Sequence, residues 1–332
     1  MPLLELTERG LFCGIAGVYI DPWRPVERAL ITHAHADHSR YGHKHYLAHH
    51  HSLPIMKHRL GDIRVQGIEY AEKIVINNVA FSFHPAGHIP GSAQIRVEYK
   101  GEVWVVSGDY KLEYDGISTP FESVKCDCFI TESTFGLPVY QWQLQQSVFD
   151  EINAWWASNA EQGIASVLTG YSLGKAQRLL ANVNPEIGPI YTHGAVDEIN
   201  QLFELNDIVE FPATMRVQGS EKKSDYRRAL IVAPPSVQGS SWLKKLQPYS
   251  LGMASGWMAL RGIRRRRSAD RGFVLSDHAD WNGLNRAIRE SGAQRVLVTH
   301  GYSSIFSRWL RDQGYDAQPL KTEFGDEETA DS

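Results

Sequence analysis

The chain has 332 residues, of which 42% are hydrophobic and 22% are charged, and its formal net charge is −4. This composition is typical of a folded globular protein, and the small net charge excludes a chain that binds nucleic acid through overall positive charge. No apolar run approaches the roughly 18 residues that a membrane-spanning helix needs. The N-terminal residues MPLLELTERGLF also lack the pattern of a secretory signal. We therefore expect no association with a membrane.

The length is sufficient for two domains of ordinary size. Three cysteines, Cys13, Cys126 and Cys128, form no CxxC pair. An odd number of scattered cysteines indicates free thiols in a reducing compartment, so we expect a cytoplasmic location.

The first 135 residues contain short strand signals. In residues 93–109, apolar side chains alternate with polar ones on either side of Lys100 and Gly101, which predicts a hairpin with one buried face. Residues 125–133 are apolar enough to form a strand inside a sheet.

From about residue 140 the pattern changes. Apolar side chains at helical spacing predict a long amphipathic helix over residues 141–160. Strand and helix signals then alternate, which indicates a small parallel α/β unit. Two more strands, in residues 272–281 and 293–302, are each expected to end in a histidine. We infer that an α/β segment is inserted into a β-rich domain.

The segment ITHAHADHSR, residues 31–40, contains four residues of the kinds that bind metals. His33 and His35 point the same way on an extended segment, and Asp37 and His38 follow where the chain turns. Neutral imidazole and carboxylate are ligands that zinc and similar divalent metals prefer. A lone histidine at a strand end would be read as a structural residue, but HxHxDH predicts a metal site.

Four ligands cannot complete two metal sites, so we expect others at strand ends beside Gly, Ser or Pro. Three residues meet this condition: His88 in PAGHIPGSAQ, Asp109 in VVSGDYK and His300 in VLVTHGY.

The motifs HAHADH, AGHIPGSA, SGDY and LVTHG, in this order and spacing, resemble the metallo-β-lactamase fold. Asp21 matches the early aspartate that this fold uses to orient its ligands. TEST, LSDHAD and THG resemble the three added motifs of the β-CASP nucleases, and GYSLGKAQRLL and PIYTHG resemble stretches of their cap. Residues 253–284 are most similar to the bacterial DNA-ligase-associated DNA exonucleases. The resemblance covers residues 10–324.

This resemblance implies a metallo-β-lactamase αββα sandwich with an inserted β-CASP α/β cap. The implied boundaries are 1–138 for the first part of the metallo-β-lactamase domain, 139–270 for the cap, and 271–332 for the second part with an acidic tail. The implied ligands are His33, His35 and His88 for a first metal, Asp37, His38 and His300 for a second, and Asp109 as a bridge.

Seven such ligands suit two ions about 3.5–4 Å apart, with a bridging water as the nucleophile. Coordination lowers the pKa of such a water from 15.7 to about 7, so hydroxide is available at neutral pH. The ligand set favours zinc, and manganese would also accept it.

Two residues, His278 and Asp37, are expected to move protons, and a third, Glu132, to orient the histidine. His278, in LSDHAD, matches the proton-donating histidine of the family, and Glu132, in TEST, is its expected orienting partner. A histidine held by a carboxylate is a suitable donor to a leaving alkoxide. The alternative for Glu132 is an ordinary carboxylate at a strand end. Asp37 can also accept a proton from the bridging water.

Contacts with substrate phosphates are expected from hydroxyls and positive charges. Ser92 follows His88, while Ser303 and Ser304 stand at the start of a helix whose positive end would face the site; the alternative is N-capping by serine. Lys175 stands where many β-CASP proteins have an arginine, which keeps the charge but not the bidentate geometry. A cluster of six arginines within residues 261–271 offers a local surface for phosphates, with a solvated helix face as the alternative. The cluster comprises Arg261, Arg264, Arg265, Arg266, Arg267 and Arg271, of which Arg264, Arg265, Arg266 and Arg267 are the expected substrate contacts.

The other histidines lack the context of a strand end. His84 is expected to be structural, and His193 copies the THG setting but lies in the cap, where we expect no ligand. We expect surface positions for the histidines of HKHYLAHHHS, which are His43, His45, His49, His50 and His51.

The resemblance implies a metal-dependent DNA exonuclease that acts in DNA repair, in functional association with a DNA ligase and a helicase. RNA processing is the alternative, because many β-CASP relatives act on RNA and no residue here decides the sugar. A small-molecule metallohydrolase on the same fold would not need Glu132, His278 or the cap. A scaffold without metals would not need seven ligand-type residues.

Overall fold

A computed structural model describes residues 2–262 and 269–320 of the chain. In these ranges the protein is of the mixed α/β class, as predicted, with three β-sheets. The residues form two compact units. The first consists of the chain up to Tyr114, Ser118–Gln141 and the residues from His278 onward, and the second of Asp115–Ile117 and Trp142–Asp277. None of the helices in the described ranges has the length and apolar character needed to cross a membrane.

The first unit contains a six-stranded sheet whose strands lie in chain order. Its first three strands pair antiparallel, and from the third strand onward the pairing is parallel. The strands are β1 (Glu5–Thr7), β2 (Gly10–Cys13), β3 (Val18–Ile20), β4 (Arg28–Leu30), β5 (His45–His49) and β6 (Val65–Ile68).

The second sheet of this unit has seven strands in the order β19-β18-β11-β10-β9-β8-β7. The predicted hairpin is confirmed: β9 and β10 pair antiparallel, and both Lys100 and Gly101 have positive φ in the turn between them. The predicted strand in residues 125–133 is also confirmed, as β11. The strands are β7 (Lys73–Ile76), β8 (Val79–Pro85), β9 (Ala93–Tyr99), β10 (Glu102–Val106), β11 (Cys128–Glu132), β18 (Arg295–Thr299) and β19 (Asp316–Pro319).

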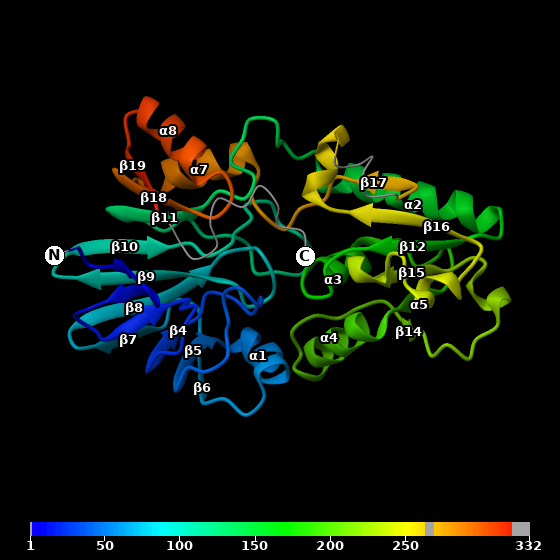
Figure 1. Cartoon of the computed structure of the whole chain (residues 1–332), viewed down its shortest axis with the longest axis horizontal. Helices are drawn as coiled ribbons and strands as arrows, with labels where there is room; N and C mark the ends of the chain where they lie inside the picture. The colour runs from blue at the N-terminus through cyan, green and yellow to red at the C-terminus, as the bar shows by residue number, and fades with distance from the viewer. Residues whose placement is uncertain (1, 263–268, 321–332) are drawn as a thin grey trace. The chain divides into compact units, whose positions relative to one another are not determined.

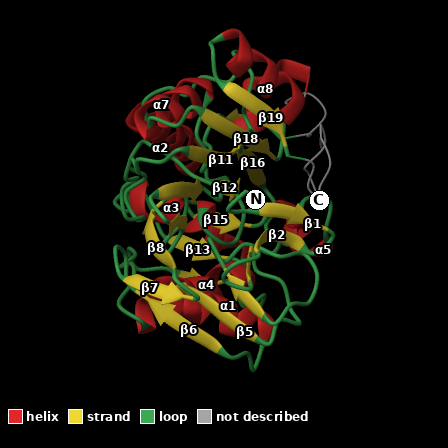
Figure 2. Cartoon of the chain, turned by 90° about the vertical axis from the view of Figure 1, so that its left-hand side faces the viewer, coloured by secondary structure: helices red, strands yellow, loops and turns green. Residues whose placement is uncertain are grey.

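The two sheets of the first unit share one hydrophobic core. Inward side chains such as Ile20 and Leu30 from one sheet and Phe81 and Trp104 from the other belong to the same buried cluster. On its other face the seven-stranded sheet carries α7 (Trp281–Ser291) and α8 (Ser303–Asp312), as Figures 1 and 2 show. A further helix, α1 (Leu53–Leu60), follows β5.

The second unit is a parallel α/β unit, as predicted. Its six strands all pair parallel in the order β14-β13-β15-β12-β16-β17, and apolar clusters cover both faces. The strands are β12 (Ala165–Thr169), β13 (Ile190–Thr192), β14 (Met215–Arg216), β15 (Leu230–Ala233), β16 (Tyr249–Ala254) and β17 (Arg271–Phe273). The helices are α2 (Gln145–Glu161), α3 (Lys175–Asn182), α4 (Gly194–Leu205) and α5 (Ser241–Lys244).

One predicted strand is shorter than expected. Strand β17 ends at Phe273, so His278 lies on a loop and not at a strand end. The helix that follows, α7, has Asp280 as its N-cap, and the Asp280 side chain accepts a hydrogen bond from the Gly283 N–H. His278 is therefore placed by the segment between a strand and a capped helix.

The carboxyl ends of the strands bring several motif residues together. Strands β10, β11 and β18 run parallel, so their carboxyl ends meet at one edge of the seven-stranded sheet. Asp109 follows β10, Glu132 ends β11 and His300 follows β18.

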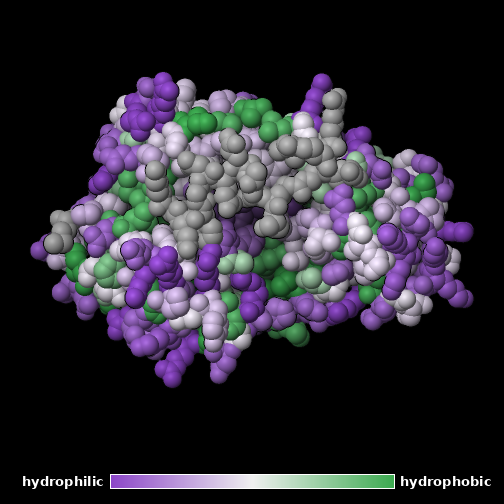
Figure 3. Space-filling view, viewed as in Figure 1, coloured by the Kyte–Doolittle hydropathy of each residue, from purple (hydrophilic) through white to green (hydrophobic). Residues whose placement is uncertain are grey.

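The visible surface carries mainly hydrophilic side chains on its described residues, with smaller hydrophobic areas (Figure 3).

Candidate metal centre

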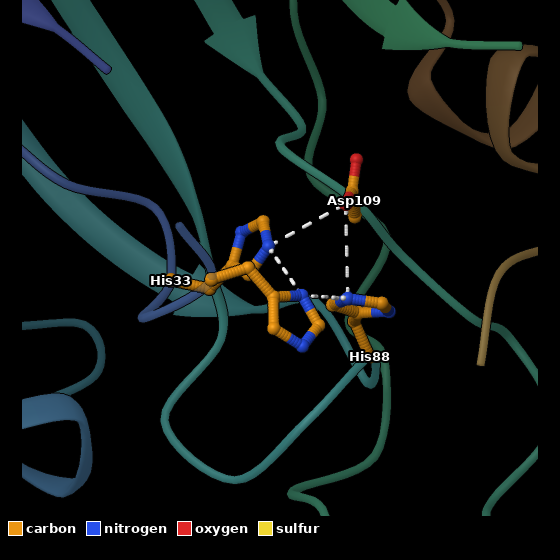
Figure 4. Close-up of side chains that lie close together, drawn as sticks. His33, His88 and Asp109 are labelled. Carbon is orange, nitrogen blue, oxygen red and sulfur yellow. Dashed lines mark hydrogen bonds and ion pairs between the residues drawn. The ribbon is translucent and has the colours of Figure 1, made fainter. Parts of the chain in front are cut away.

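Four of the predicted ligands converge in a buried cluster. The ligand atoms of His33, His35, His88 and Asp109 all lie within 4.8 Å of one another. His35 Nδ1 is 3.1 Å from both His33 Nε2 and His88 Nε2. Figure 4 shows His33 and His88 turned toward Asp109. These residues come from three separate loops, after β4, β8 and β10.

A second cluster shares the same aspartate. His38, Asp109 and His300 also have ligand atoms within 4.8 Å of one another. One oxygen, Asp109 Oδ2, lies 3.4 Å from His33 Nε2, 3.7 Å from His88 Nε2 and 3.6 Å from His38 Nε2. Asp109 therefore stands between the two histidine groups, in the position of a bridge.

Asp37 lies at the rim of the second cluster. Its Oδ2 atom is 3.5 Å from His38 Nε2, and 49% of the side chain is exposed. The structure thus places six predicted ligands inside the two clusters and the seventh beside them.

The spacing of these atoms fits metal ligands. Ligand nitrogens at 2.0–2.1 Å from a tetrahedral zinc stand about 3.3–3.4 Å apart. The imidazole nitrogens are separated from one another by 3.1 Å and from Asp109 Oδ2 by 3.4–3.7 Å, which is close to this value. His38 Nε2 is buried and makes no hydrogen bond within the described part of the chain, although it faces two carboxylates. A cation would satisfy it.

The pKa values also suit a cation site. Burial lowers the pKa of His88 well below its usual value and lowers that of His300, which keeps both rings in the neutral form that binds metals. Burial opposes protonation of His38 as well, but Asp37 and Asp109 outweigh it and raise the pKa of His38 well above its usual value. The carboxylates that attract this proton would attract a metal ion in its place.

A second set of residues orients the predicted ligand His38. Asp21 Oδ2 is 2.7 Å from His38 Nδ1, the geometry expected of the early aspartate. Thr32, which was not among the predicted site residues, holds Asp21: its N–H donates to Asp21 Oδ1 at 2.8 Å and its hydroxyl donates to Oδ2 at 2.5 Å. The same hydroxyl lies 3.1 Å from His33 Nδ1. Its place directly before HxHxDH was the only signal for it in the sequence.

His300 is held by Ser133, which was also not among the predicted site residues. It adopts a positive φ of 50° and is followed by Gly301 at 67°. The Ser133 hydroxyl, which is buried, donates to the carbonyls of Thr299 and His300, and the Ser133 carbonyl accepts from the Tyr302 N–H. Because a non-glycine residue with positive φ is strained, these contacts fix the turn that presents His300.

His278 and Glu132 form a hydrogen-bonded pair beside Asp109. His278 Nδ1 lies 2.9 Å from Glu132 Oε2 and 3.1 Å from Oε1. Glu132 is only 1% exposed, and its Oε1 accepts a hydrogen bond from the Tyr110 N–H. With Nδ1 held by the carboxylate, Nε2 is the nitrogen that could exchange a proton with a substrate. This contact supports the predicted pairing with His278 over the alternative, in which Glu132 is an ordinary carboxylate at a strand end.

The serines predicted to bind phosphate differ in their surroundings. Ser92 is 1% exposed, and its hydroxyl accepts hydrogen bonds from the N–H groups of His88 and Ile89, so it braces the His88 loop. Ser303 is buried in the first turn of α8, whereas Ser304 is exposed there. The N-cap of α8 is Tyr302 and has no side-chain capping bond, so the alternative of N-capping by serine is wrong.

Lys175 is placed inside the second unit. It is 4% exposed, and its Nζ atom lies 3.4 Å from Asp277 Oδ2, while Arg178 Nη1 lies 3.1 Å from Oδ1 of the same carboxylate. This ion-pair network uses the charge of Lys175 within the fold, and a phosphate contact of Lys175 stays a prediction. The basic cluster of Arg264, Arg265, Arg266 and Arg267 lies outside the described residues.

The expectation for the histidines of residues 43–51 is partly wrong. His45 and His50 are exposed, but His43 and His49 are buried. His49 stacks on Tyr70 with ring centroids 3.7 Å apart, a contact between residues too distant in sequence to be predicted from local pattern.

Comparisons with known proteins agree with this geometry. None of the protein-family models searched matches the chain. Over 322 residues the chain is 29% identical to a protein named "Probable DNA ligase" from Opitutus terrae, in an alignment that covers 96% of this chain and 31% of that protein. The chain thus spans about a third of the length of this relative.

Two further relatives carry ribonuclease or RNA-processing names. An "RNase J-like protein" from Methanocaldococcus jannaschii is 25% identical over 85% of this chain and 83% of its own length. The "Cleavage and polyadenylation specificity factor subunit 3" of Dictyostelium discoideum is 24% identical over 55% of this chain and 27% of its own length.

One solved structure resembles the fold. A protein of unknown function from Enterococcus faecalis V583 has a TM-score of 0.58 and 11% identity, covering 90% of this chain and 80% of that one. At this identity the likeness shows the fold alone. The relatives, together with the His/Asp clusters, imply a centre for divalent metals. By their names, these relatives support the resemblance of the chain to the β-CASP nucleases of the metallo-β-lactamase fold.

Proposed function

We propose that this protein is a two-metal DNA exonuclease that acts in DNA repair. The observation that carries the proposal is Asp109 Oδ2, which lies 3.4–3.7 Å from imidazole nitrogens of both histidine groups, with the His278–Glu132 pair beside it. A bridging carboxylate between two metal positions and an adjacent proton donor are the parts that hydrolysis of a phosphodiester requires.

We also propose that the first unit is a metallo-β-lactamase αββα sandwich and that the second is the β-CASP cap expected over residues 139–270. The core shared by the two sheets, and the packing of α7 and α8 on the outer face of the seven-stranded sheet, support the sandwich. The insertion of a parallel α/β unit between Gln141 and His278 supports the cap.

The metal ligands in this proposal are His33, His35, His88 and Asp109 for one ion, and Asp37, His38, His300 and Asp109 for the other. Zinc is our first choice, and manganese the second, because the donors are imidazole and carboxylate. When bound, the ions would supply Lewis-acid stabilisation of the phosphodiester and a lowered pKa for water at the site.

The protein's own groups would then move the protons. Asp37 is the exposed carboxylate at the rim, so it can accept a proton from the attacking water. His278 donates from Nε2 to the leaving oxygen, because Glu132 fixes Nδ1 and stabilises the protonated ring. Asp21 and Thr32 keep His38 in one orientation throughout.

The choice of DNA rests on the relative named a DNA ligase, because 96% of this chain aligns with a segment of that longer protein. The same match supports a functional association with a DNA ligase; association with a helicase and a cytoplasmic location stay predictions. RNA is the second candidate substrate, because the RNase J-like relative matches over most of both chains.

The decisive experiment compares matched nucleic acids. Protein stripped of metal with a chelator is given Zn²⁺ or Mn²⁺ and incubated with end-labelled linear DNA, the covalently closed circle of the same sequence, and RNA of that sequence. We expect shortening of the linear DNA from an end, with the circle and the RNA intact. Asp37→Ala should abolish cleavage, and Asp62→Ala, at an exposed aspartate outside the site, should not.

His278→Ala separates chemistry from metal binding. Loss of a general acid costs about 10²–10⁴-fold in rate, while the metal content should stay that of the wild type. Degradation of RNA alone would favour the second candidate, and cutting of the circle would make the enzyme an endonuclease. Metal-loaded protein that cuts no nucleic acid, or that hydrolyses a lactam or thioester instead, would overturn the proposal.

A further inference from the structure

The loop that carries HxHxDH needs support from outside itself. Strand β4 ends at Leu30 and β5 begins only at His45, so His35 lies well beyond the last paired residue. In contrast, His300 directly follows its strand, β18. The sheet can therefore place His300 but cannot by itself fix the far end of the HxHxDH loop.

Arg59 on α1 supplies two hydrogen bonds to this loop. Its Nη1 group donates to the Ala34 carbonyl at 2.5 Å and to the Ser39 hydroxyl at 2.7 Å. Ala34 lies between the first two histidines of the motif, and Ser39 directly follows the last one. One guanidinium thus joins Ala34 and Ser39, between which lie three of the predicted ligands, His35, Asp37 and His38.

Ser39 connects Arg59 to the middle of the loop by hydrogen bonds. Its hydroxyl donates to the His35 carbonyl at 3.1 Å, and its N–H donates to the same carbonyl at 2.8 Å. Ala34 and Ser39 are both buried, and Arg59 is half-buried. Hydrogen bonds from a charged donor to buried acceptors are stronger than those between neutral groups, so these contacts favour one shape of the loop.

We propose that Arg59 is a positioning residue, which holds the HxHxDH loop in the shape that binds metal. The proposal rests on the metal centre and not on the identity of the substrate. The hydrogen bonds of Arg59 go to the Ala34 carbonyl and the Ser39 hydroxyl, so its positioning effect passes through the backbone and through Ser39, and its charge is attracted to the Asp37 carboxylate as well.

Because Arg59 is charged, the direction in which its removal changes the metal affinity distinguishes positioning of the loop from repulsion of the ions. A guanidinium near two divalent ions repels them, so a residue that acted through its charge alone would weaken metal binding. Removing that charge would then tighten binding. A residue that acts by positioning gives the opposite result, because its removal releases the loop.

The test measures metal binding without nucleic acid. Co²⁺ serves as the probe, because its visible spectrum reports the ligand geometry, and a chromophoric chelator competes for it. Arg59→Met should lower the Co²⁺ affinity by about 10-fold or more, the usual cost of losing a group that orients ligands. Arg59→Lys keeps the charge but not the fork of donors, so it should fall between the wild type and Arg59→Met.

Lys57→Met is the matched control, because Lys57 is exposed on the same helix and its loss removes the same charge. Its Co²⁺ affinity should stay within about twofold of the wild type, since a surface charge is screened. Ser39→Ala removes only the hydroxyl contact and should weaken binding in the same direction, which keeps the test valid if Arg59→Met does not fold.

Unchanged or tighter Co²⁺ binding by folded Arg59→Met would overturn the proposal, as would an equal loss in Lys57→Met. Because no nucleic acid is present, failure of the proposed nuclease activity leaves this test unaffected, and failure of this test leaves the nuclease assay open.

Discussion

Replacing Thr32 with valine tests how Asp21 and Thr32 hold the predicted metal ligands in place. Thr32 is 1% exposed and directly precedes the HxHxDH motif. Its hydroxyl donates to Asp21 Oδ2 at 2.5 Å and lies 3.1 Å from His33 Nδ1 and 3.4 Å from His38 Nδ1. Valine has nearly the same shape but no donor, so Thr32→Val removes these contacts without creating a cavity.

The structure sets the size of the expected effect. A hydrogen bond to a charged group contributes about 1.5–3 kcal/mol, so the unfolding free energy of metal-free Thr32→Val should fall by about this amount. Asp21 also loses one of the contacts that fix it against His38. Loss of such an orienting contact costs about 10–100-fold in metal affinity.

Two measurements on the same samples check this prediction: urea unfolding of metal-free protein, and competition for Zn²⁺ against a chelator. Thr32→Ser is the control, because it keeps the hydroxyl and loses only a methyl group, at about 0.8 kcal/mol. Its metal affinity should stay close to that of the wild type. If Thr32→Val keeps both its stability and its affinity, the hydroxyl does not hold Asp21, and the reasoning fails.

Two other features of the described residues give predictions. Gly301 has a φ of 67°, and an added Cβ would lie 2.6 Å from Thr134 Cα, so Gly301→Ala should disrupt the His300 turn and weaken binding of Co²⁺. The control is Gly163→Ala, because Gly163 has a φ of 66° but open space around it. This control should cost only about 1–2 kcal/mol of unfolding free energy and leave Co²⁺ binding intact. Similar unfolding free energies for the two variants would contradict this contrast. His49 is 1% exposed and stacked on Tyr70, and burial lowers its pKa from 6.5 to about 3. Because the unfolded chain binds a proton at His49 below pH 6.5 and the folded chain does not, the unfolding free energy should fall by about 1.4 kcal/mol per pH unit as the pH drops from 6 toward 3. His49→Phe keeps the stacking and should flatten this slope in urea unfolding; equal slopes would show that His49 does not titrate in this way.

Local pattern in the sequence determined much of the secondary structure. The hairpin of β9 and β10 follows from alternating side chains around Lys100 and Gly101, and both turn residues have the positive φ that such a turn requires. The long helix α2 follows from apolar residues at helical spacing. These features depend on neighbours in the chain, so the sequence alone contains the information.

The sequence also indicated which residues would meet. His33, His88, Asp109 and His300 were picked out by ligand chemistry beside turn residues at strand ends, and they lie together in the structure. Parallel strands of one sheet present their carboxyl ends at the same edge, which is why this reasoning works across long separations in the chain.

Only the tertiary structure decided what surrounds these residues. The contacts of Arg59 with the HxHxDH loop, of Ser133 with His300, and of Lys175 with Asp277 join segments that are distant in sequence, and no local pattern marks them. The burial of His49 depends in the same way on packing against Tyr70. A side chain's type shows what chemistry it can do, but its hydrogen-bond partners and its burial depend on which distant segments fold against it. The sequence therefore determined the candidate ligands, and the fold decided which other residues hold them in place.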